Sequence, residues 1–81
     1  MPTMTAQQVL DRHFLEIRCE LLNLAAALDR IERHAEADQA RTDPRMADIR
    51  QGLEILSREG DDRAERIQIL FSDLYREGWN R

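Results

Sequence analysis

The sequence predicts an all-α protein with one long N-terminal helix and two shorter helices. Apolar residues recur at spacings of three and four along most of the 81 residues, and no alternating strand pattern of any length appears. Glycine and proline are scarce, with three and two residues, and most of them lie between the periodic segments. Residues typical of helix caps precede each of these segments, and they set the expected boundaries.

The first helix is expected over residues 5–40. Thr5 and Gln8 match a capping box, and Met4 and Val9 occupy the two positions of a hydrophobic staple around it. Beyond this start the helical pattern continues without a glycine or proline. At 1.5 Å per residue such a helix is about 54 Å long. One of the shorter helices alone does not cover it.

The second helix is expected over residues 44–58. Asp43 followed by Pro44 is typical of an N-cap and the first helical position, and Gly60 is expected to end the helix. Gly52 lies in the middle, where glycine costs up to about 1 kcal/mol relative to alanine. We consider two explanations for Gly52, a close approach of another helix and a tolerated irregularity.

The third helix is expected over residues 62–77. Asp62 and Glu65 form an acidic analogue of a capping box, and Gly78 is placed to close the helix. The second and third helices together match the length of the first. They form either one broken arm of a helical hairpin or, if the third helix folds back, a three-helix bundle. We expect residues 1–81 to be a single helical domain.

Two apolar stripes run along the first helix. The first apolar stripe alternates spacings of four and three over about four heptads, as a coiled-coil seam does; it consists of Leu10, Phe14, Ile17, Leu21, Leu24, Leu28, Ile31 and Ala35. The second apolar stripe lies about 160° around the helix; it consists of Leu15, Cys19, Leu22 and Ala26. Residues 14–28 are therefore predicted to be buried on two opposite sides.

The second apolar stripe predicts a homodimer. Monomers seldom expose large contiguous apolar patches, so we expect one stripe to pack on the chain's own shorter helices and the second to meet another copy. Such a dimer forms a four-helix-type bundle. The small size agrees with this, because a chain of 81 residues buries only about 60–65 % of its unfolded surface. Its single cysteine excludes an internal disulfide.

A metal site is the alternative way to stabilise the chain. His13, Glu16 and Glu20 lie within about 60° of each other, on the flank between the two stripes. A twofold dimer could bring two such sets together, with two histidines and four carboxylates for a di-metal site of iron, manganese or zinc. The competing interpretation is a solvated flank without metal, in which Arg12 pairs with Glu16. On that interpretation no cofactor is expected.

The C-terminal segment holds the only tyrosine and the only tryptophan, Tyr75 and Trp79. Aromatic residues next to arginine are enriched at binding hot spots, so this segment is a candidate for binding a protein partner. The alternative is that Trp79 folds back as a hydrophobic cap.

Composition excludes several classes of function. The net charge of −4 repels a phosphate backbone, so no nucleic acid is expected. The longest apolar run, Leu24 to Leu28, is far too short to span a membrane, and the N-terminus lacks the pattern of a signal peptide. All basic residues are arginine, which indicates GC-rich coding. We expect a cytoplasmic bacterial protein.

No catalytic motif is present in the sequence. The sequence therefore favours a non-enzymatic protein that homodimerises through its long first helix and serves as a protein-binding or adaptor module. The alternative is a metal-binding helical bundle with its site at His13, Glu16 and Glu20.

Overall fold

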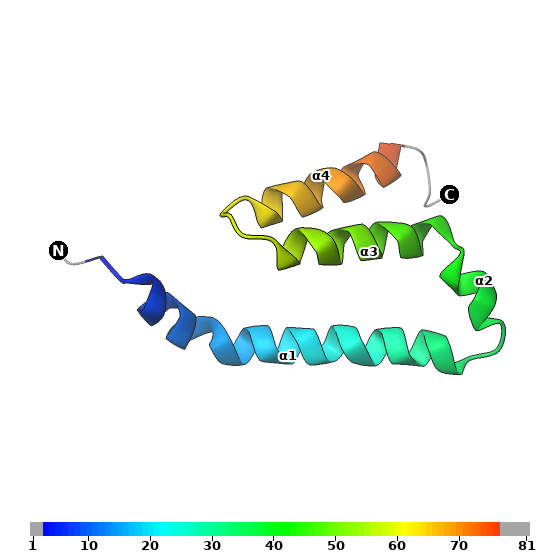
Figure 1. Cartoon of the computed structure of the whole chain (residues 1–81), viewed down its shortest axis with the longest axis horizontal. Helices are drawn as coiled ribbons and strands as arrows, with labels where there is room; N and C mark the ends of the chain where they lie inside the picture. Colours follow the sequence, from blue (N-terminus) through cyan, green and yellow to red (C-terminus); the bar gives the residue numbers. More distant parts are fainter. Residues whose placement is uncertain (1–2, 77–81) are drawn as a thin grey trace. The chain divides into compact units, whose positions relative to one another are not determined.

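The computed structural model describes the backbone of residues 3–76 and the side chains of residues 3–72. All regular structure in this part is helical: α1 (Ala6–Arg33), α2 (Ala37–Arg41), α3 (Pro44–Ser57) and α4 (Arg63–Arg76) (Figure 1). The prediction of an all-α fold with one long N-terminal helix is confirmed. The chain divides into two compact units, Met1–Ala37 and Asp38–Arg81, and each is described here by itself. The single domain expected over residues 1–81 stays a prediction.

The start of α1 follows the predicted capping box. The backbone N–H of Gln8 donates to Oγ1 of Thr5 over 3.2 Å, and the backbone N–H of Thr5 donates to Oε1 of Gln8 over 2.9 Å. The two residues thus satisfy each other's backbone donors at a helix end, where backbone N–H groups have no partner within the helix.

The end of α1 corrects the helix predicted over residues 5–40. The helix stops at Arg33, and His34 is its C-cap in an extended conformation. The ring Nδ1 of His34 lies 2.6 Å from the carbonyl oxygen of Arg30 and donates to it, which occupies an acceptor that the helix leaves free. Glu36 then adopts a positive φ of 64°, so the chain turns before α2 begins. With 28 residues, α1 is about 42 Å long rather than about 54 Å.

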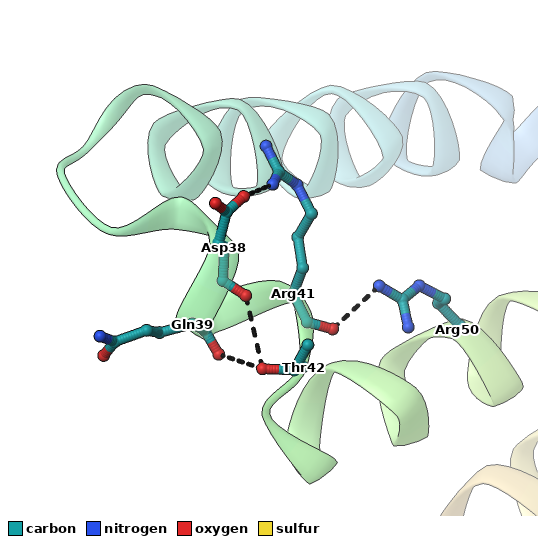
Figure 2. A network of polar contacts seen from close by, with 5 residues as sticks. All are labelled: Asp38, Gln39, Arg41, Thr42 and Arg50. Atoms are coloured by element: carbon teal, nitrogen blue, oxygen red, sulfur yellow. Dashed lines mark hydrogen bonds and ion pairs between the residues drawn. The ribbon is translucent and has the colours of Figure 1, made fainter.

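Polar contacts connect α2 to α3 (Figure 2). The Thr42 hydroxyl donates to the carbonyl oxygen of Gln39 over 3.1 Å, and Arg50 donates from α3 to the carbonyl oxygen of Arg41 over 3.2 Å. Asp38 and Arg41 form an ion pair across one turn. The last four carbonyl groups of α2 therefore all have partners outside the helix.

The predicted N-cap of α3 is also present. The Asp43 carboxylate accepts the backbone N–H of Arg45 over 2.8 Å, and the guanidinium of Arg45 donates to both carboxylate oxygens over 3.0 Å. Pro44 occupies the first turn, where its missing N–H is harmless. The hydrogen bonds from Arg45 stabilise the charged carboxylate and lower the pKa of Asp43 below its ordinary value of 3.8.

In the second unit α4 folds back along α3, and the two helices pack against each other (Figure 1). The broken arm considered from the sequence is therefore not formed, because that arrangement needs α3 and α4 to follow each other end to end. At the turn, Asp62 pairs with Arg66 over 3.0 Å. The side chain of Asp62 thus makes an ion pair one turn into α4.

Gly52 lies at the contact between α3 and α4. It is the one buried residue among residues 3–72. A Cβ atom added at Gly52 would lie 3.4 Å from Cδ1 of Ile67 and 3.9 Å from Cδ2 of Leu70. The glycine therefore marks a close helix approach, which is the first of the two explanations considered from the sequence. The space at the contact is enough for one methyl group and no more.

Substituting Gly52 should separate helix propensity from packing. For Gly52→Ala we expect the free energy of unfolding to rise by about 0.5–1 kcal/mol, because alanine favours a helix and its methyl group makes ordinary contacts. For Gly52→Leu we expect it to fall, because the larger side chain pushes α3 and α4 apart. Urea unfolding followed by circular dichroism measures both. Destabilisation by Gly52→Ala would show that the contact is tighter than described.

The Asp43 carboxylate should titrate below 3.8 in a carbon-detected NMR titration, and Arg45→Ala should move its midpoint upward. Because the folded-state pKa is lowered, the contribution of Asp43 to stability is complete above its unfolded-state pKa. It is lost as the pH falls through the folded-state pKa. Asp43→Asn keeps an N-cap without a titrating group, and it should remove this part of the acid dependence. An unchanged midpoint in Arg45→Ala would contradict the assignment.

Candidate interaction surface on α1

The second apolar stripe lies exposed on α1. Leu15 and Leu22 keep 63 % and 57 % of their surface accessible, and Cys19 and Ala26 are exposed as well. These are large values for leucine, which usually lies inside a protein. All four residues that the sequence predicted as a dimer interface are therefore accessible to a partner. Their pairing with another copy stays a prediction.

The first apolar stripe is also accessible over its N-terminal half. Leu10, Phe14 and Leu21 keep 49 %, 57 % and 57 % of their surface exposed. The stripe is shorter than predicted, because α1 ends at Arg33 and the last predicted member, Ala35, lies beyond the helix.

A shallow, open groove connects the two stripes on one flank of α1. Its lining residues are Phe14, Ile17, Arg18, Leu21, Leu22 and Ala25. Residue spacing predicted the stripes on opposite sides of α1 and did not predict this connection. The signal was Ala25, which lies about 40° from Leu21 and about 60° from Leu22 around the helix. On this flank the apolar surface is continuous, and Arg18 is its one charged member.

Neither unit encloses a core of its own in the described part of the chain. Among residues 3–72 no hydrophobic side chain is fully buried. Even the α3–α4 contact leaves Leu53, Leu56 and Ile69 at 36 %, 48 % and 57 % exposure. Much of the apolar surface that the sequence concentrates on α1 is thus exposed.

The three candidate metal ligands are only partly brought together. Nδ1 of His13 lies 3.5 Å from Oε1 of Glu16, one turn apart on α1. No group of three or more histidine, cysteine, aspartate or glutamate residues suited to a metal occurs within the described residues of one chain. Glu20 therefore does not complete a site with His13 and Glu16 in a single copy. The proposed site depends on a second copy and stays a prediction.

A second groove lies between α3 and α4 and is lined by both charged and aliphatic side chains. It is lined by Gln51, Glu54, Ile55, Arg58, Arg66 and Ile69. Its charged groups are paired locally, since Arg58 lies 3.5 Å from Glu54 and Arg66 pairs with Asp62. This surface is open and solvated, and among residues 3–72 no polar side chain is buried to select a small ligand.

The two aromatic candidates of the C-terminal segment have side chains outside the described residues. Tyr75 belongs to the backbone of α4, but its side chain lies outside the described residues, as does all of Trp79. Partner binding through this segment stays a prediction.

Comparisons of the chain with protein-family models, curated proteins and solved structures gave no match. Within the described part of the chain, no helix has both the length and the apolar character needed to cross a bilayer. The exposed apolar surface of α1 is therefore the feature that most strongly indicates a function.

Metal content distinguishes the two functions expected from the sequence. If the α1 surface serves association alone, iron, manganese and zinc in the purified protein should total well below one equivalent per dimer. A chelator should leave the thermal midpoint unchanged, because no binding energy is lost. Elemental analysis and thermal unfolding measure both. A stoichiometric metal that disappears in His13→Ala would contradict this and support the site at His13, Glu16 and Glu20.

Proposed function

We propose that this protein is a non-enzymatic helical module that homodimerises through α1. The observation that supports this most strongly is the exposure of the second apolar stripe, with Leu15 and Leu22 more than half accessible on a well-capped helix. An apolar surface of this extent on a soluble helix marks an interaction site.

Energetics favour covering this surface. Complete burial of a leucine side chain contributes about 1.5–3 kcal/mol, and a twofold interface uses each residue twice. The second apolar stripe supplies two leucines per copy, so four leucines leave water in the dimer. The small members, Cys19 and Ala26, lie about two turns apart and let the two helix axes approach each other.

In this proposal the dimer acts as an adaptor. Twofold symmetry presents two copies of the α3–α4 hairpin, each with its open groove lined in part by Arg58, Arg66 and Ile69. Two linked copies of one binding surface raise the effective concentration for a partner that itself carries two sites. The mixture of arginine and aliphatic side chains in the groove suits a protein surface, where arginine is enriched.

Changing Leu22 should weaken the dimer. We expect Leu22→Glu to raise the dissociation constant by at least about a hundredfold, because two charges enter an apolar interface and two leucines are lost. Leu22→Ala keeps a good helix former and should give a smaller loss. Sedimentation velocity at several concentrations measures the association.

Gln39→Glu is the matched control. It adds the same charge at an exposed position of α2 and should leave the dissociation constant unchanged. If Leu22→Glu and Gln39→Glu behave alike, the second apolar stripe is not the interface.

A further inference from the structure

The second apolar stripe continues into a charged residue at each end. Arg12 lies three positions before Leu15, and Asp29 lies three positions after Ala26. The extended stripe is Arg12, Leu15, Cys19, Leu22, Ala26 and Asp29, with spacings of 3, 4, 3, 4 and 3. These spacings read the same in both directions, while the two terminal charges are opposite in sign.

We infer that the partner of α1 is a second copy of α1 in antiparallel orientation, with Arg12 opposite the partner's Asp29 at both ends of the interface. This inference rests on the proposed homodimer and specifies its geometry. It places Leu15 opposite the partner's Ala26, and Cys19 opposite the partner's Leu22.

Charge complementarity is the first argument for this orientation. In an antiparallel coiled coil the two helices run in opposite directions, so a residue near the start of the stripe in one copy faces a residue near its end in the other. Arg12 of each copy therefore faces the partner's Asp29, and the dimer contains this pair twice. In a parallel pair in register, each residue meets its own counterpart. Arg12 would then face a second Arg12, and Asp29 a second Asp29. Like charges at both ends of one interface oppose association.

Side-chain volume is the second argument. The antiparallel register combines one leucine with one small residue in every apolar layer, either Ala26 or Cys19. A parallel register would combine leucine with leucine in two layers and two small residues in the others. Layers of equal volume keep the helix axes at a constant separation, and alternating large and small residues across facing positions packs a core without voids.

The extent of α1 is the third argument, and it comes from the structure. The midpoint of α1 (Ala6–Arg33) falls between Cys19 and Glu20, and the midpoint of the extended stripe falls between Glu20 and Leu21. An antiparallel partner centred on the stripe therefore overlaps α1 along almost its whole length. A helix that continued to residue 40 would have left one end without a partner.

Charge reversal in the full-length chain tests the orientation. At low salt, Arg12→Glu and Asp29→Arg should each raise the dissociation constant about tenfold, because two attractive pairs become repulsive. The double variant with both changes should return to within about threefold of the native value, because the pairs are restored in reverse. Glu59→Arg reverses an exposed charge outside α1 and is the control. Circular dichroism checks that helix content is kept.

Disulfide formation gives an independent readout. In a Cys19→Ala background, a chain with Leu15→Cys mixed with a chain with Ala26→Cys should form a crosslinked heterodimer on mild oxidation. A chain with Leu15→Cys alone should not crosslink to itself, because antiparallel helices place these two positions well beyond the reach of a disulfide.

The results that would contradict the antiparallel orientation differ from the result that would contradict the proposed homodimer. A dimer in which Leu15→Cys crosslinks to itself, or in which the single charge reversals do not weaken association, overturns the antiparallel orientation and leaves the homodimer standing. Single reversals that weaken the dimer without recovery in the double variant overturn the pairing of Arg12 with Asp29. A native chain that sediments as a monomer overturns the proposed function itself.

Discussion

Eleven of the fifteen residues from Phe14 to Leu28 are apolar. They lie on two faces of one helix, and a helix cannot bury its own faces. Burying apolar surface is the dominant favourable term in folding. Yet no hydrophobic side chain among residues 3–72 is fully buried. Covering the apolar surface of α1 is therefore the main physical constraint on this chain. In the proposed dimer, association is part of the stability of the chain, and function depends on the residues that become paired.

The ends of the helices are determined locally, and this is why the sequence predicted them well. Thr5 and Gln8 form their capping box across one turn, and Asp43 caps α3 with a contact two residues away. Such contacts need no information from distant parts of the chain. The role of Gly52 was more difficult to predict, because it depends on the side chains of α4 that approach this glycine.

The end of α1 was not predicted, because neither glycine nor proline marks it. His34 and Glu36 end the helix with a side chain to main chain hydrogen bond and a positive φ, and both residue types also occur inside helices. The basic residues Arg30 and Arg33 in the last turn were the available signal. On the candidate surface, spacing identified both stripes, and the angular position of Ala25 between them was the signal for the groove that was missed.

The dependence of stability on protein concentration tests most directly whether α1 is covered by association. Thermal unfolding followed by circular dichroism should give a midpoint that rises steadily as the native protein is concentrated, because a folded dimer is favoured by mass action. A midpoint that stays constant over a wide range of concentration, with full helix content at the lowest, would show that the isolated chain is stable alone. That result would contradict the account.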